Sequence, residues 1–179
     1  DTFYLMRDIG LDRELFGNRM KLEQYDNMIT LDLDVVSFFS IMISSTGIDP
    51  ADFYMNRLKG NVRVGFALQK LDELMQAYMD YEYNQTMDDE DFRYLIFNSI
   101  QRSPMLTFIQ ILPDRVIDIL DMMDNGKIPC SVDDIKVNGN DVKELLGVSG
   151  ETIGKAIDFL RRRALVEDYD WTDRDKTIR

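Results

Sequence analysis

One short segment carries residues whose types and spacing could bind an anion. The run Ser149–Gly154 (SGETIG) precedes an apolar stripe of helical spacing, so we expect a helix to begin there with Ser149 as its N-cap. The first amides of a helix have no partners within it, and they carry the positive end of its dipole. We therefore expect these amides to bind phosphate, with Lys143 and Lys155 beside them.

Glycines give this segment a second property. Gly150 and Gly154 leave the first turn of the expected helix without side chains, so another backbone or a ligand can approach closely. A structural alternative stays open, in which Gly147 and Gly150 only permit tight packing of two helices. Spacing alone does not separate the two interpretations.

Basic residues gather in two places although the protein is acidic. Lys and Arg number 21 against 33 Asp and Glu, which gives a formal charge of −12. Arg161, Arg162 and Arg163 are consecutive, and the stretch Arg57–Lys70 contains basic residues but no acid. Such blocks are often solvated helix faces. If an acidic protein binds RNA, it must use local basic patches and backbone amides.

Several kinds of chemistry are excluded or disfavoured. The chain has no histidine, which excludes a histidine general base and a histidine-ligated metal centre. The single Cys130 forms no internal disulfide and fits a reducing cytosol, so a cytoplasmic location is expected. Asp32 and Asp34 resemble a metal-binding pair, but the apolar run after them predicts a helix on which they diverge, and we expect them to cap it. We expect no catalytic site and no metal site in this chain.

The elements that must position these residues are helices. Apolar residues recur at i, i+3, i+4 and i+7 almost throughout, which predicts an all-α fold. Residues 30–45 are apolar on every side and indicate a buried helix, and polar residues are placed to begin later helices at Asp49, Asn61 and Asp88. No apolar run reaches about 18 residues, so no membrane-spanning segment is expected.

The sequence predicts a separate helical tail at the end of the chain. Asp141 and Glu144 approximate a capping box for a short helix that Gly147 ends, before the helix near residue 150. A linker at 127–131 contains proline and follows a glycine stop. The sequence therefore predicts a multi-helix body at 1–128 and, at 129–179, a small tail with a helix-hairpin-helix-like turn.

The tail also carries a resemblance. The run Ile135–Leu160, which reads I-K-V-N-G-N-D-V-x-E-L-L-G-V-S-G-x-x-I-G-x-x-I-x-x-L, resembles the start of the tail of bacterial class II CCA-adding tRNA nucleotidyltransferases and their poly(A) polymerase relatives. That family has a similar G-N-D-L…G…G-P-x-I-G run, and Ser149-Gly150 stands where many members have Pro-Gly or Gly-Pro. Met6–Phe16 and Phe53–Lys59 are similar to the GLL…LFP and FLRRLKFS regions of the family's helical body.

This resemblance implies the tRNA-binding half of a transferase in tRNA processing. In the family, body and tail hold the tRNA by backbone and phosphate contacts, while an amino-terminal head adds nucleotides. Neither the head's glycine-rich loop nor the nucleotide-selecting neck is recognisable here, so magnesium, CTP and ATP are expected only in a head and neck of the same polypeptide. A chain that begins with Asp fits a fragment of a longer protein. The expected RNA contacts are Lys143, Ser149, Gly150, Thr152, Gly154, Lys155, Arg161, Arg162 and Arg163 in the tail, and Arg57, Lys59 and Arg63 in the body.

Two other functions stay open. In the first, the chain is a non-enzymatic helical interaction domain whose acidic body docks a basic protein partner. In the second, it is a helix-hairpin-helix DNA-binding module, which shares the anion-binding turn but not the body. A preference for duplex DNA over folded tRNA would favour the second of these.

Overall fold

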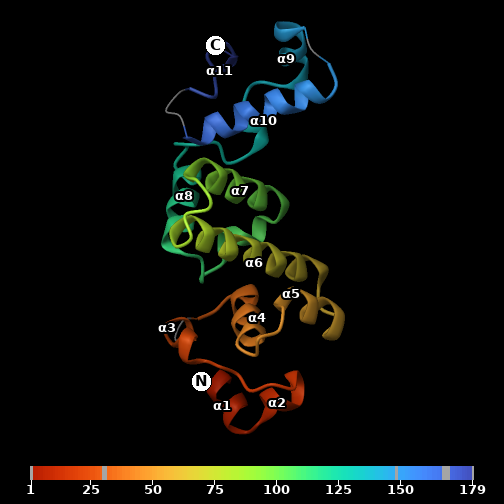
Figure 1. The fold of residues 1–179 in the computed structure, drawn as a ribbon, viewed down its shortest axis with the longest axis vertical. Coiled ribbons are helices and arrows are strands. Elements are labelled where there is room, and N and C mark those ends of the chain that lie inside the picture. The colour runs from red at the N-terminus through yellow and green to blue at the C-terminus, as the bar shows by residue number, and fades with distance from the viewer. Residues whose placement is uncertain (1, 30–31, 148, 167–169, 179) are drawn as a thin grey trace. The chain divides into compact units, whose positions relative to one another are not determined.

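The computed structural model describes residues 2–29, 32–147, 149–166 and 170–178, and these residues contain helices and no strand (Figure 1). The predicted all-α fold is confirmed. No helix among them has both the length and the hydropathy that crossing a membrane requires. The α-helices are α1 (Thr2–Asp8), α2 (Leu11–Phe16), α3 (Asp26–Ile29), α4 (Val35–Ser44), α5 (Pro50–Asp52), α6 (Val62–Glu82), α7 (Asp89–Arg102), α8 (Asp114–Asp124), α9 (Gly139–Leu146), α10 (Glu151–Val166) and α11 (Arg174–Ile178). The shorter turns are η1 (Glu23–Tyr25), the π turn η2 (Phe53–Arg57), η3 (Pro104–Phe108) and η4 (Val132–Asp134).

The chain forms two compact units. The first comprises residues 1–75 and 103–112, and the second comprises residues 76–102 and 113–179. Helix α6 crosses from one unit to the other at residue 75. These units divide the chain differently from the expected body and tail, whose boundary at residue 128 stays a prediction.

The buried helix of the first unit is α4. Its residues Ile41 and Ile43 are at most 1% exposed. The helix begins directly after Asp34, later than predicted, because Oδ1 of Asp34 accepts hydrogen bonds from the amides of Val36 (2.8 Å) and Ser37 (3.0 Å). The expectation that this carboxylate caps the buried helix is confirmed.

Three further polar residues begin helices as predicted. Asp49, Asn61 and Asp88 each accept a hydrogen bond from a backbone amide two or three residues later. A residue at this position satisfies one of the amides that a helix start leaves without a partner. These starts could be predicted because the interaction is local in sequence.

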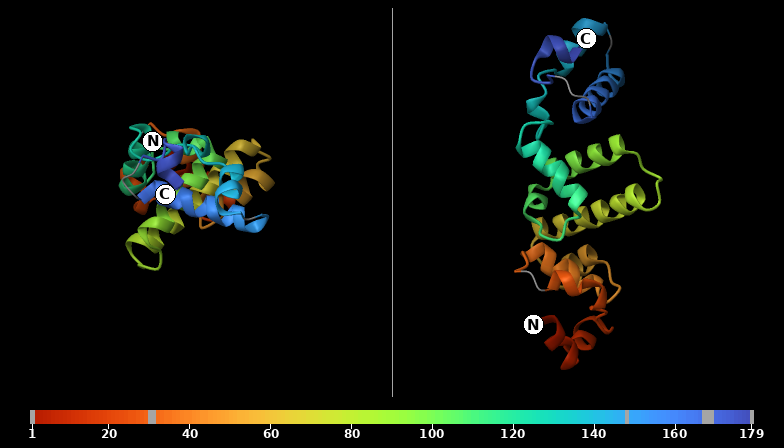
Figure 2. Two further views of the ribbon diagram at one scale, coloured as in Figure 1. Left: turned by 90° about the horizontal axis from the view of Figure 1, so that it is seen from above. Right: turned by 90° about the vertical axis from the view of Figure 1, so that its left-hand side faces the viewer.

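The second unit is built around α7. The rings of Tyr81 and Phe92 stack with their centroids 4.7 Å apart and their planes at 4°, and this contact joins the end of α6 to α7, toward which the chain turns back after residue 82 (Figure 2). Phe92 and Ile96 are fully buried. Helix α10 packs against both α7 and α9, and its residues Ala164 and Leu165 are completely inaccessible. The core of this unit therefore fixes the carboxyl end of α10 and leaves its amino end to be positioned by α9.

Candidate nucleic-acid interface

A reciprocal pair of side chains begins α9. The side chain of Asn138 accepts hydrogen bonds from the amides of Asn140 (2.8 Å) and Asp141 (3.3 Å), and the carboxylate of Asp141 accepts one from the amide of Asn138 (2.9 Å). This arrangement is a capping box, so α9 begins at Gly139. The prediction that Asp141 and Glu144 form the box was wrong, because Asp141 already occupies the third helical position.

Helix α11 holds the same carboxylate from the other side. Nε of Arg174 donates a hydrogen bond to Oδ1 of Asp141 (2.8 Å), and Nη2 lies 2.7 Å from it. The amide of Asn138, together with this guanidinium, lowers the pKa of Asp141. Sequence analysis missed Arg174 because the two partners lie 33 residues apart. The start of α9 is thus fixed by both a local and a distant contact.

Two glycines bound the turn between α9 and α10. Gly147 and Gly150 both have φ of +63°, a conformation that L side chains rarely adopt. A Cβ added at either position would meet no atom within 4 Å, so tight helix packing does not explain these residues. Helix α10 begins at Glu151, which places Gly150 rather than the predicted Ser149 directly before it. Val148 lies outside the described residues.

The third glycine of the segment is different. Gly154 lies within α10 on its exposed first turn, where its backbone is helical and a Cβ would again meet nothing within 4 Å. Neither conformation nor packing requires a glycine here, although glycine in a helix interior costs about 1 kcal/mol relative to alanine. The surface over this turn is therefore open to the close approach of a ligand.

The two predicted lysines lie on the solvent side of the same helices. Lys143 on α9 is exposed, and the described residues give it no ion pair. Nζ of Lys155 lies 2.8 Å from Oε1 of Glu151, with the two side chains 75% and 83% exposed. A pair this exposed contributes less than about 1 kcal/mol, so a phosphate can replace the carboxylate at little cost. Ser149 and Thr152 are also exposed.

The central arginine of the consecutive three is engaged within the protein. Nη1 of Arg162 forms an ion pair with Asp91 of α7 and lies 3.7 Å from Oε1 of Glu90. Its guanidinium also lies over the ring of Tyr94, 4.2 Å from the centroid. The hydrogen bond with Asp91 raises the pKa of this arginine. Arg162 therefore connects α10 to α7.

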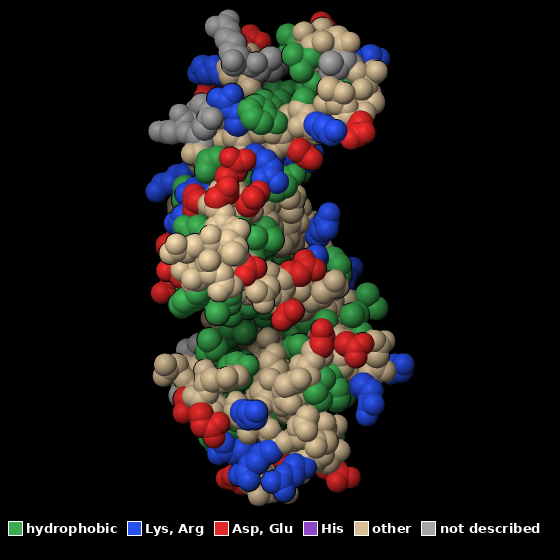
Figure 3. Space-filling model, viewed as in Figure 1, with side chains coloured by type: hydrophobic (Ala, Val, Ile, Leu, Met, Phe, Trp, Pro, Cys, Tyr) green, Lys and Arg blue, Asp and Glu red, His purple; other side chains and the backbone are tan. Residues whose placement is uncertain are grey.

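The other two arginines have partners on α10 itself. Nη1 of Arg161 lies 3.3 Å from Oδ1 of Asp158, and the guanidinium of Arg163 lies 5.7 Å from the ring centroid of Phe159. Figure 3 shows the same pattern on the face in view, where basic side chains on the part formed by α9 to α11 lie beside acidic ones. Their predicted contacts with RNA stay a prediction, and they would have to compete with these internal partners.

The second basic stretch belongs to the first unit. Arg57, Lys59 and Arg63 are exposed around the π turn η2 and the start of α6. Lys70, at the end of the stretch, is only 7% exposed and pairs with Glu73. The structure thus places the predicted body contacts and the predicted tail contacts in different compact units.

Of the two aspartates before α4, Asp34 serves the fold. Besides capping the helix, Asp34 accepts a hydrogen bond from the amide of Gln110 at 3.1 Å, which holds the residues after η3 against the start of α4. Asp32, which was also expected to cap α4, lies in the irregular segment before it, and the N-cap is Asp34. Among the described residues, no group of three or more His, Cys, Asp or Glu side chains is placed to hold a metal ion.

The sequence analysis also missed a cavity in the second unit. Trp171 and Lys127 both line it, from segments that flank α8 and α11. The signal available in the sequence was that Trp171 is the single tryptophan of the chain, placed in a polar segment near its end. Nothing in the spacing of the two residues indicated that they share a cavity.

No protein-family model, no curated protein and no solved structure matches this chain. The resemblance of Ile135–Leu160 to the tail of the CCA-adding enzymes therefore rests on its motif residues, and the activity that it implies stays a prediction.

Proposed function

We propose that this chain binds the phosphate backbone of a folded tRNA through the tail helix pair, by which we mean residues 139–166. In this proposal the chain is the body and tail of a tRNA nucleotidyltransferase that adds CCA, and it positions the RNA for a catalytic head that the 179 residues do not contain. The head would supply the chemistry with magnesium, CTP and ATP. The motif residues of Ile135–Leu160 and the geometry of α9 and α10 support this function.

The observation that carries the proposal is the open surface at Gly154. A glycine that the fold does not need, on the first turn of a helix, lets a sugar-phosphate backbone come closer to the helix than any side chain would allow. The exposed hydroxyls of Ser149 and Thr152 and the two exposed lysines supply further hydrogen-bond donors on the same helix pair. Glu151 opposes binding electrostatically, and Lys155 already neutralises it in part.

The charge distribution sets the expected strength of binding. The net charge of −12 repels a polyanion at long range, and Arg162 is held by Glu90 and Asp91. Few cations are then available for phosphate contacts, so we expect weak, salt-sensitive binding whose log–log salt slope is small, because that slope scales with the number of contacted phosphates. Binding in the nanomolar range that persists at high salt would contradict this.

The decisive experiment measures tRNA affinity against salt concentration for the double variant Lys143→Ala/Lys155→Ala. We expect a loss on the order of tenfold at low salt, and a log–log salt slope reduced by about one to two, since each lost phosphate contact removes roughly one unit. The matched control is Arg19→Ala/Lys21→Ala, which removes two exposed cations from the first unit. Unchanged affinity in the first variant, or equal losses in both, would remove the tail helix pair from RNA binding.

A second candidate function is protein docking, which one observation favours. An apolar groove in the second unit is lined by α9 and α10, and Leu145, Leu146 and Phe159 on it are 51%, 60% and 58% exposed. Exposed apolar patches of this kind often mark interaction sites. Duplex DNA, tRNA and an apolar peptide measured side by side would separate the three candidate functions.

A further inference from the structure

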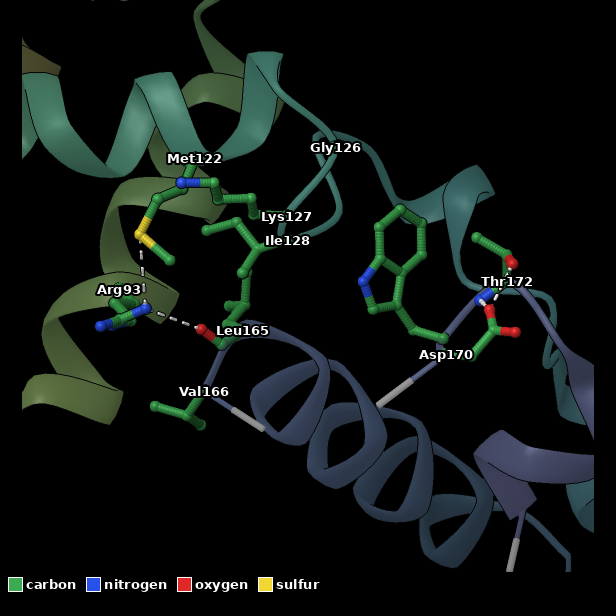
Figure 4. Close-up of a pocket in the computed structure, with 10 residues that line it drawn as sticks. Arg93, Met122, Gly126, Lys127, Ile128, Leu165, Val166, Asp170 and Thr172 are labelled. Carbon is green, nitrogen blue, oxygen red and sulfur yellow. Dashed lines mark hydrogen bonds between the residues drawn. The ribbon is translucent and has the colours of Figure 1, made fainter. Parts of the chain in front are cut away.

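The second unit contains a cavity of about 600 Å³ that the proposed RNA contacts do not use (Figure 4). Four segments meet around it: α7, the end of α8 with the residues that follow it, the carboxyl end of α10, and the segment before α11. Its volume lies in the range of small-molecule sites. The lining residues are Arg93, Met122, Gly126, Lys127, Ile128, Leu165, Val166, Asp170, Trp171 and Thr172.

Much of the wall is apolar and rigidly held. Ile128 and Leu165 are 4% and 0% exposed, so they belong to the core as well as to the cavity. Nη1 of Arg93 donates a hydrogen bond to the carbonyl oxygen of Leu165 (3.1 Å) and lies 3.9 Å from the sulfur of Met122, as the dashed lines in Figure 4 show. Nε of Arg93 also forms an ion pair with Oδ2 of Asp89 at 2.6 Å. This arginine therefore fixes the wall and is not free for a ligand.

One aromatic residue adds a stacking surface to this wall. Trp171 is half-buried, and its carbonyl oxygen accepts a hydrogen bond from the amide of Lys136 at 3.4 Å, which fixes its backbone. An indole ring that lines a cavity of mixed polarity and stays partly accessible suits a flat aromatic ligand. Base stacking on such rings needs no particular sequence, because every nucleobase has a π face.

Among the polar groups of the cavity, a cation is available to an anionic group of that ligand. The carboxylate of Asp170 accepts hydrogen bonds from Oγ1 of Thr172 (2.5 Å) and from Nζ of Lys176 (3.1 Å), so it already has partners. Lys127 is exposed, and no ion pair involves it within the described part of the chain. The cavity thus joins a stacking surface to one cation that a phosphate can contact.

We propose that this cavity binds an unstacked nucleobase of the RNA, with the base on the indole of Trp171 and a neighbouring phosphate on Lys127. The inference rests on the proposed function, because it assigns to the bound RNA one splayed nucleotide in addition to the backbone contacts of the tail helix pair. A base taken out of the stack is the form in which proteins most often recognise RNA with aromatic side chains.

The single tryptophan gives a direct experiment. The 179-residue chain is titrated with AMP, with adenosine and with a single-stranded RNA trinucleotide, while the fluorescence of Trp171 is followed. We expect saturable quenching by all three, with AMP binding several-fold more tightly than adenosine. In Lys127→Ala that advantage of AMP should vanish while quenching by adenosine is kept. Absence of quenching by every probe, or an unchanged advantage of AMP in Lys127→Ala, overturns the inference.

Two further variants keep the experiment decisive. Trp171→Phe retains a ring and Trp171→Ala does not, so affinity for a dye-labelled trinucleotide should fall roughly tenfold only in the alanine variant. Equal losses in both, with unchanged thermal unfolding, count against stacking.

The variant Lys143→Ala/Lys155→Ala should keep the AMP response. If it does while wild-type tRNA binding is absent, the proposed function fails, and the cavity is a site for a free nucleotide and not for a base of bound RNA. If tRNA binds without quenching Trp171, the proposed function stands and the cavity site fails.

Discussion

Two packed glycines of the first unit and three open glycines of the tail helix pair stand in opposite environments. In the first unit, a Cβ at Gly60 would lie 2.2 Å from the buried ring of Tyr54, and one at Gly65 would lie 2.3 Å from Cγ of Met55. In the tail helix pair, the positions of Gly147, Gly150 and Gly154 are open to solvent. The first pair permits close packing, and the second group shapes a turn and an accessible helix start.

The cations of the two regions differ in a similar way. Lys70 is buried beside the ring of Phe66 and pairs with Glu73, so it belongs to the packing of the first unit. In the tail helix pair, Lys143 and Lys155 are exposed, whereas Arg162 is committed to α7. Residue type and charge therefore do not mark a binding residue by themselves, and the environment of each one decides its role.

The largest expected effect tests the packed side of this comparison. Gly60→Ala places a methyl group against the ring of Tyr54, which is 7% exposed and cannot move freely. Overpacking of this kind costs about 1–3 kcal/mol, so the free energy of unfolding in urea should fall by that amount. Affinity for tRNA per folded molecule should not change. A variant as stable as the wild type would show that the ring of Tyr54 yields and that Gly60 is not a packing glycine.

A smaller effect tests the committed cation. Arg162→Ala removes the ion pair with Asp91 and the contact with Tyr94, so we expect a loss of about 1 kcal/mol in stability, since the pair is partly exposed. Lys155→Ala is the matched control on the same helix, and its stability should be unchanged within about 0.5 kcal/mol. Thermal unfolding of both variants measures the difference. Equal stabilities would mean that Arg162 does not anchor α10, and Arg162 would again be a candidate for contact with RNA.

The smallest expected effect on stability concerns the open glycine, Gly154, and here the free energy of unfolding should rise. Gly154→Ala adds a good helix former where a Cβ meets nothing, so the free energy of unfolding should rise by about 0.5–1 kcal/mol. Affinity for tRNA should nevertheless fall, because the methyl group holds the RNA backbone away from the first turn of α10. Calorimetry and filter binding on the same sample give both numbers. A more stable variant with undiminished affinity would leave Gly154 without a role in binding.

The parts of the fold that could be predicted were local in sequence. Apolar periodicity predicted the helices, and Asp34, Asp49, Asn61 and Asp88 lie at or next to the helix starts they were expected to cap. The box at the start of α9 was predicted one turn too late because two overlapping runs of residues fit the same pattern. Local signals give the existence of a helix more reliably than its boundary.

The sequence by itself determined that the chain is helical, where several helices begin, and that a glycine-containing turn precedes α10. These properties follow from interactions that span four residues or fewer. Only the tertiary structure decided which side chains are available to a ligand. It pairs Arg162 with Asp91, buries Lys70, leaves Gly154 open and brings Trp171 to the cavity that Lys127 lines. These outcomes depend on contacts between residues far apart in the chain, and no local pattern encodes them.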